Sequence, residues 1–335
     1  MKKLLLLFAT MLVAVAATHA QTPTATLSHE GTVKCFYGSD AFKNAVAEAV
    51  DGDDITLSSG QFNGGININK AIKIQGAGMS VDTINCIEPT IICSSFPVYS
   101  NIIVEGVVFD DVVEVHSSSR FIRCLLHSIT AGGDANSPNE PITNDLINCF
   151  CTSGTTSGMY STLNIINCFV AKLKNQSSQN SYIISHNSII IPSYAADTNP
   201  VGIYNSSFTN CIFFSSTNKT LRSNNYAYYC IGFNGDGSFL NNVSGMTNQS
   251  LNKNLINTFF KTFDGTNYNE YETFELTTAA QSTYLGDDGT QVGIYGGSMP
   301  FNPKPNNPYI TKCTVAEKST PQGTLSVDIE VKPAQ

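Results

Sequence analysis

Acidic and basic side chains that could take part in catalysis lie close together in the sequence near the middle of the chain. Asp110 and Asp111 are adjacent, and Arg120 and Arg123 follow shortly after them. Carboxylate oxygens are the ligands that Ca²⁺ prefers, and a guanidinium pairs strongly with a carboxylate on a ligand. These four residues are the candidate catalytic residues, with Asp110 and Asp111 as candidate calcium ligands. A simpler interpretation is favoured: the aspartates form a solvated corner, and Arg123 merely holds a structural position.

Other familiar reaction centres are missing from the sequence. The histidines that follow residue 20 are His29, His116, His127 and His186, and none of them is spaced from another as paired metal ligands are. No nucleophile elbow and no phosphate-binding loop occurs. No Cys-x-x-Cys pair indicates a zinc or redox site. The sequence therefore leaves open whether the protein is an enzyme.

A motif repeated along the middle of the chain predicts the elements that carry these residues. Each copy places an Asn, or Gly106 or Arg123, before a small side chain and then alternates apolar residues. The repeat length is about twenty residues, and short strands without helices fill it, which is typical of one coil of a β-solenoid. The small residue of the motif is found at Val107, Cys124, Cys149, Cys168, Ser188, Cys211 and, in a looser copy, Val243.

The residue before the small side chain is expected at a corner between two strands. Asparagine and glycine tolerate the left-handed backbone that such a corner requires, and stacked amides can also bond from coil to coil. The corner residues would be Gly106, Arg123, Asn148, Asn167, Asn187, Asn210 and Asn242.

Cysteines at the inward positions are expected to form a buried ladder. Because side chains alternate across a strand, the small residue and the residue two positions later point into the bore. Parallel side chains on stacked coils do not give bridging geometry, so free thiols are favoured over disulfides. The disulfide status of the others stays open, with Cys86 and Cys93 as one candidate pair and with Cys35, Cys230 and Cys313 unassigned.

An apolar stripe should lie on the outer surface of the coils, between the two inward positions. Exposed stripes usually mark a contact. The favoured interpretation is that a loop, or the tail after Gly297, covers the stripe. The alternative is a docking surface on which Phe150 and Phe169 stack on sugar rings. The stripe contains Val108, Leu125, Phe150, Phe169, Ile189 and Ile212.

Composition and charge restrict the class of protein. Charged residues are 13 % of the chain and tryptophan is absent, whereas a helical protein of this size would carry more Glu, Lys and Arg. The chain has 18 basic and 26 acidic residues and a net charge of −8. Phosphate binding needs clustered Lys and Arg, so a nucleic-acid partner is excluded.

Residues 1–20 have the pattern of a signal peptide. Lys2 and Lys3 precede an apolar run that ends at Ala17, and the small residues Thr18 and Ala20 flank His19 before Gln21. No later segment approaches the ~20 apolar residues of a membrane span. We therefore expect an exported protein that starts near Gln21 and is periplasmic, cell-surface or extracellular.

The whole pattern resembles pectate-lyase-like right-handed β-helix proteins, particularly the secreted ones of Bacteroidetes. The residues that carry the resemblance are Gly52–Leu57 after a helical pattern, the Asn-Cys repeats and the segment Gly286–Gly297. The resemblance implies an all-β, right-handed single-stranded parallel β-helix over residues 21–297. A capping helix would lie at about 40–50, and a C-terminal β tail, 298–335, would pack on the solenoid.

The scaffold carries enzymes and adhesins alike, so it does not fix an activity. Lyases of this fold use Arg or Lys beside calcium held by acidic residues. If the protein is an enzyme, a lyase is favoured over a glycoside hydrolase, because the spaced aspartates of hydrolases do not follow Asp111. We expect an exported protein that binds a polysaccharide or cell-envelope component without clear catalytic machinery, and with no certain cofactor. The alternative is a calcium-dependent polysaccharide (uronate) lyase.

Overall fold

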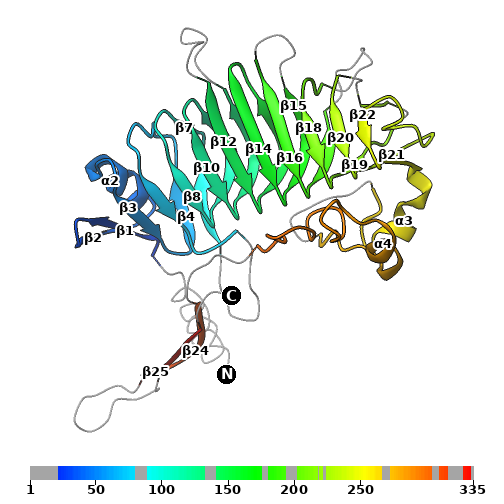
Figure 1. The fold of residues 1–335 in the computed structure, drawn as a ribbon. Helices are drawn as coiled ribbons and strands as arrows, with labels where there is room; N and C mark the ends of the chain where they lie inside the picture. Colours follow the sequence, from blue (N-terminus) through cyan, green and yellow to red (C-terminus); the bar gives the residue numbers. More distant parts are fainter. Residues whose placement is uncertain are drawn as a thin grey trace, which may run out of the picture.

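The computed structural model describes residues 22–79, 89–132, 141–175, 180–193, 202–217, 219–221, 224–265, 272–303, 309–315 and 327–332. The predicted signal peptide and Cys86 lie outside these residues. The described chain is all-β and forms a parallel β-solenoid of about 9 turns (Figure 1). This confirms the predicted parallel β-helix.

Two long sheets make up the wall of the solenoid. The 12-stranded sheet, sheet A, contains in spatial order β2 (Thr32–Tyr37), β1 (Thr24–His29), β3 (Asp54–Leu57), β5 (Lys73–Gln75), β8 (Ile103–Glu105), β10 (Ser119–Ile122), β12 (Ile142–Ile147), β14 (Ser161–Ile166), β16 (Tyr182–His186), β18 (Ser207–Thr209), β20 (Tyr226–Tyr228) and β22 (Ser244–Met246). The 11-stranded sheet, sheet B, contains β4 (Gly60–Asn63), β6 (Thr90–Cys93), β7 (Phe96–Val98), β9 (Val108–Val115), β11 (Leu125–Ala131), β13 (Phe150–Ser157), β15 (Phe169–Asn175), β17 (Ile189–Pro192), β19 (Ile212–Phe214), β21 (Ile231–Asn234) and β23 (Gln249–Asn252).

From Gly106 to Thr247, the chain passes from sheet A to sheet B through a left-handed corner in each coil. This confirms the expected role of the motif, because its Asn residues and Arg123 have φ between 48° and 56°. The prediction that Asn242 and Val243 form a further, looser copy of the motif is wrong. The corners there are Tyr229, with φ 53°, and Thr247, with φ 57°. A positive φ is uncommon for Tyr and Thr, so no sequence signal marked them.

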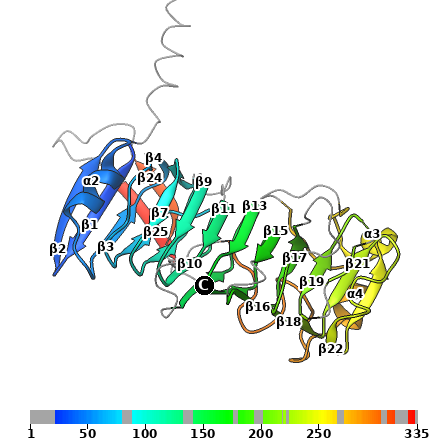
Figure 2. The ribbon, with the colours of Figure 1, turned by 90° about the horizontal axis from the view of Figure 1, so that it is seen from above.

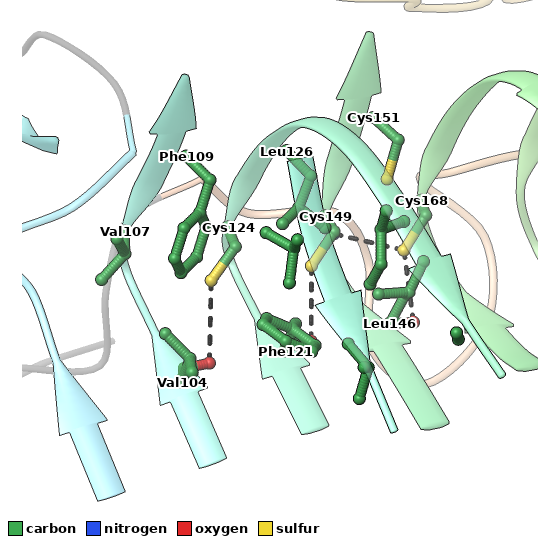
Figure 3. Packing of buried hydrophobic residues seen from close by; sticks show 14 of the residues in the cluster. Val104, Val107, Phe109, Phe121, Cys124, Leu126, Leu146, Cys149, Cys151 and Cys168 are labelled. Carbon is green, nitrogen blue, oxygen red and sulfur yellow. Dashed lines mark hydrogen bonds between the residues drawn. The ribbon is translucent and has the colours of Figure 1, made fainter. Parts of the chain in front are cut away.

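The core of the solenoid is the predicted ladder of thiols and apolar side chains (Figure 3). Cys124, Cys149 and Cys168 are fully buried and free. Each thiol donates to a carbonyl oxygen of the neighbouring coil, as from Cys149 to Phe121 at 3.3 Å. Cys230, whose status was open, is a further buried free thiol, and Cys93 is free as well. The side chain of Cys313 lies outside the described residues.

A helix and a hairpin close the N-terminal end. The helix α2 (Ala41–Glu48) buries Phe42, Ala45 and Val46 against the first coils, which confirms the predicted capping helix. β1 and β2 form an antiparallel hairpin that extends sheet A beyond β3.

The coils end at Asn252, earlier than the predicted boundary at residue 297. Residues 253–265 and 272–302, named here the cover segment, turn back along sheet B and contain η2 (Lys253–Leu255), α3 (Ile256–Phe259) and α4 (Thr278–Thr283). In Figure 1 this segment runs from yellow to orange below the coils. Beyond it, β24 (Tyr309–Val315) and β25 (Val327–Lys332) pair as an antiparallel hairpin.

Candidate functional site

The cover segment buries the apolar stripe on sheet B from Phe150 to Ile212. Phe150 and Phe169 are 3 % and 0 % exposed, and Phe274 of the cover segment stacks on Phe169 with ring centroids 4.5 Å apart. Neither ring has a free face for a sugar. The stripe is therefore covered from Phe150 onward, as the favoured interpretation held, whereas Val108 and Leu125 are only partly buried. The sugar-stacking role of Phe150 and Phe169 does not fit their burial.

Corner asparagines hold the cover segment in place. The Asn167 amide donates to the carbonyl oxygens of Ile294 and Gly296, both at 2.8 Å. Asn210 and Asp287 exchange two hydrogen bonds, of 2.7 and 3.0 Å. Where the sequence suggested amides bonded from coil to coil, these amides bind the cover segment instead. The part of sheet B from β13 onward is therefore packed against the cover segment.

Asp110 and Asp111 lie in β9 of sheet B and are exposed. The Asp110 carboxylate accepts a hydrogen bond from the backbone N–H of Ser94, and that of Asp111 accepts one from Val112. Among the described residues, no group of three or more His, Cys, Asp or Glu side chains could hold a metal ion. The pair has the surroundings of a solvated corner.

The two arginines belong to sheet A and its corner and already have partners. Arg120 lies 2.9 Å from the Asp145 carboxylate, and Arg123 lies 3.0 Å from Glu105. The second pair is largely buried. The structure does not bring either arginine to the two aspartates. Asp110 and Asp111 lie on β9 in sheet B, whereas Arg120 lies on β10 in sheet A and Arg123 lies at the corner that follows β10.

The outer face of sheet A carries the functional candidates that the sequence reasoning missed. Its strands lie side by side in Figure 1, and the cover segment packs on sheet B instead. The paired register aligns one outward residue from each coil along the solenoid axis. This row, named here the axial row, contains Lys73, Ile103, Arg120, Asp145, Asn164, Ile184, Ser207 and Tyr226.

Large side chains of this face remain exposed. Tyr226 and Ile184 of the axial row are 52 % and 39 % exposed, and Tyr182, two residues before Ile184 on β16, is 42 % exposed. Tyrosine offers a ring for stacking and a hydroxyl for hydrogen bonding at the same place. The C-terminal half of the axial row is therefore an aromatic and aliphatic surface open to solvent.

A groove of about 520 Å³ lies at the N-terminal half of the same face. It crosses successive coils beside the starts of β5, β8, β10 and β12. Asp145 is fixed on its wall by Arg120 and by the Asn164 amide at 2.9 Å. Polar groups thus line it in defined positions around exposed Ile103. The lining residues are Gly52, Ala71, Ile72, Lys73, Asn101, Ile102, Ile103, Ser118, Ser119, Arg120, Thr143 and Asp145.

A sequence signal for the axial row did exist. From Ile103 to Tyr226, each member stands three residues before the corner residue of its coil. The residue that follows each of these members, such as Phe121 or Leu146, is fully buried. Side chains alternate along a strand, so the row member itself points outward. Once the corner residues are known, the sequence predicts which residues form the axial row. It does not predict that no other segment covers the row.

No protein-family model, no curated protein and no solved structure matches the chain. Within the ranges that the structure describes, no helix is both long enough and apolar enough to cross a membrane.

Proposed function

We propose that this protein is an exported β-helix that binds a glycan or another cell-envelope component along the outer face of sheet A, without catalysing a reaction. The observation that carries the proposal is the axial row with its groove and exposed tyrosines. We also propose that it is akin to the pectate-lyase-like proteins of Bacteroidetes and acts in the periplasm, on the cell surface or outside the cell.

The periodicity of the face favours an extended polymer. Neighbouring strands of a sheet lie about 4.8 Å apart, so one row member follows another at this interval along the axis. A glycan strand that lies along the axis would meet a polar or aromatic side chain of the row on every coil except those of Ile103 and Ile184. Tyr182 and Tyr226 would stack on sugar rings, and Asp145 and Asn164 would bond hydroxyl groups.

The proposal of binding without catalysis rests on the state of the carboxylates. A general base must be free to accept a proton from its substrate. On this face the carboxylates of Asp145 and Glu105 are each bonded to an arginine. Charge pairs of this kind position a ligand and fix the wall of a groove, and neither of these two carboxylates is free to act as a base.

A glycan array followed by titration calorimetry tests the proposal. Replacing Tyr226 with Ser should weaken binding roughly 2- to 12-fold, the equivalent of about 0.5–1.5 kcal/mol of stacking. Tyr182→Ser should act in the same direction. The matched control is Tyr99→Ser, because Tyr99 is 50 % exposed but stacks on His116 instead of lying in sheet A. Equal effects of all three variants, or no ligand on the array, would contradict the proposal.

The calcium-dependent lyase is the competing function, and one assay separates it. The purified protein is incubated with uronate polymers, with calcium or with a chelator, and unsaturated products are followed by their ultraviolet absorbance. Calcium-dependent release that Arg120→Ala abolishes would replace binding with lysis as the function. We expect no release.

A further inference from the structure

The strand β2 is a free edge at the N-terminal end of the solenoid. It is the terminal strand of sheet A and, among the residues that the structure describes, pairs with β1 alone (Figure 2). All of its residues except Phe36 are exposed. An uncovered edge with unpaired backbone groups is a template for pairing with another strand.

The turn of the hairpin tells which backbone groups face the free edge. The turn residues Glu30 and Gly31 have φ of 45° and 82°, and His29 faces Thr32 across them. In such a two-residue turn, the flanking pair shares both hydrogen bonds, and the bonded pairs then alternate along the ladder. Thr32, Lys34 and Phe36 therefore bond to β1. Val33, Cys35 and Tyr37 direct their N–H and C=O groups outward.

The same three residues also project their side chains from one face. Their partners on β1 are Ser28, Thr26 and Thr24, on its outer side. Val33 is 60 % exposed, Tyr37 is 69 % exposed, and Cys35 between them is an exposed free thiol.

The opposite face of β2 is already used. Lys34 forms an ion pair with Glu48 of α2, and Phe36 packs against the core of the solenoid. These contacts hold β2 against the body of the protein, so its free edge is presented as a fixed strand.

We propose that the free edge of β2 pairs with β2 of a second copy of this chain. The two strands run antiparallel about a twofold axis at Cys35, so sheet A continues from one copy into the other. An identical strand fits because a twofold interface must be self-complementary.

The register supports the second copy as the occupant. With the axis at Cys35, Val33 of each copy lies opposite Tyr37 of the other, and pairs of aromatic and β-branched residues stabilise antiparallel strands. Lys34 lies opposite Phe36. Moving the axis to Lys34 would instead place two lysines directly opposite each other, which is destabilising.

Cys35 then reports on the contact. Directly opposed residues of a hydrogen-bonded antiparallel pair have Cα atoms about 5.5 Å apart, within the range of a disulfide. Oxidised glutathione can form this bond. Two Cys35 thiols lose two electrons and two protons and become one disulfide, and the glutathione disulfide is reduced to two thiols.

Sedimentation velocity of the purified protein in reductant, over a concentration series, tests the proposal. We expect a reversible dimer, because a contact of two strands is small for a protein interface. Val33→Lys should leave a monomer, since charged side chains protect sheet edges. The control is Met246→Lys on β22, the opposite edge strand of sheet A, where Met246 is 59 % exposed. This variant should still dimerise.

A second measurement uses non-reducing electrophoresis after incubation with oxidised glutathione. The parent protein should give a covalent dimer, and Cys35→Ser should give none while it still dimerises in sedimentation. Circular dichroism confirms that each variant is folded. A parent protein that stays monomeric in reductant, a Val33→Lys variant that dimerises as the parent does, or cross-linking through a different cysteine would each overturn the proposal.

Discussion

Corner asparagines serve two purposes at the residue scale. Asn167 has φ 50° and at the same time donates two hydrogen bonds to the cover segment. Asparagine tolerates a left-handed backbone better than most residues, and its amide can satisfy carbonyl groups of a neighbouring segment. The backbone requirement of the coil therefore also supplies the side chains that attach the cover segment.

Replacing Asn167 with Ala should destabilise the protein by about 2–4 kcal/mol. Left-handed strain contributes about 1–2 kcal/mol, and the buried carbonyls that lose their donor contribute the rest. Urea unfolding measures the loss. Asn167→Gly removes the bonds without the strain and should cost less. Asn242→Ala is the matched control: Asn242 is exposed and is no corner, so a change beyond about 0.5 kcal/mol there would contradict the argument.

The pair of His29 and Asp53 should make stability depend on pH. The hydrogen bond and the charge of Asp53, 2.6 Å away, raise the pKa of His29 above 6.5. Protonated His29 therefore stabilises the fold fully below pH 6.5, and this contribution disappears as the pH rises through the higher folded pKa. The melting temperature should fall over this window in the parent protein. The fall should be smaller in His29→Gln, and identical profiles would contradict the assignment.

At the same pair, burial would raise the pKa of Asp53, but hydrogen bonds from the Val50 N–H and His29 outweigh it and lower the pKa. The stability that Asp53 contributes should therefore be lost in acid, as the pH falls below its usual range and through the lowered pKa.

At the element scale, each coil adds one inward thiol or small side chain to a continuous ladder. Burial raises the pKa of the Cys151 thiol far above its usual value, and burial likewise raises the pKa of Cys124 and Cys168. The thiolate is the reactive form, so these thiols should be inert while the coils stay stacked. The ladder behaves as apolar packing material.

Labelling with a maleimide should separate the exposed cysteine from the ladder. In the native protein Cys35 should react first, and Cys124, Cys149, Cys168, Cys211 and Cys230 should react only after denaturation. Mass spectrometry of proteolytic peptides identifies each modified residue. Rapid native labelling of any ladder thiol would show that the stack is open or wrongly registered.

At the scale of the whole molecule, the cover segment links successive coils. Solenoid coils contact their neighbours alone, so stability is distributed along the stack. Phe274 packs on both Phe150 and Phe169, and Asn210 and Asn167 bind the cover segment on separate coils. The cover segment therefore makes several coils act as one unit.

Phe274→Ala should release the cover segment, with a loss of about 3–5 kcal/mol of local stability. Hydrogen exchange followed by mass spectrometry should then show faster exchange in residues 253–302 and in the strands beneath, with little change in β3 and β5. Phe301→Ala, at the partly buried end of the segment, should have a smaller effect. Uniformly faster exchange along the chain would instead mean that the coils depend globally on the cover segment.

The sequence by itself determined the coil. Alternation of apolar residues, asparagine at the corner and a small residue after it are local signals, and they fixed which side chains enter the core at Cys124, Cys149, Cys168 and Cys211. The same alternation fixed the outward axial row. The sequence did not predict the corners at Tyr229 and Thr247. There the neighbouring coils impose a left-handed backbone, which these residue types do not favour.

The tertiary structure decided which outer face is free and which charges are neutralised. Phe169 and Tyr226 both point outward from their coils, but a segment about a hundred residues later in the chain buries the first and leaves the second open. Arg120 pairs with Asp145 directly across the neighbouring strands β10 and β12. The cover of sheet B depends on where a returning segment places its residues, and local alternation contains no information about that.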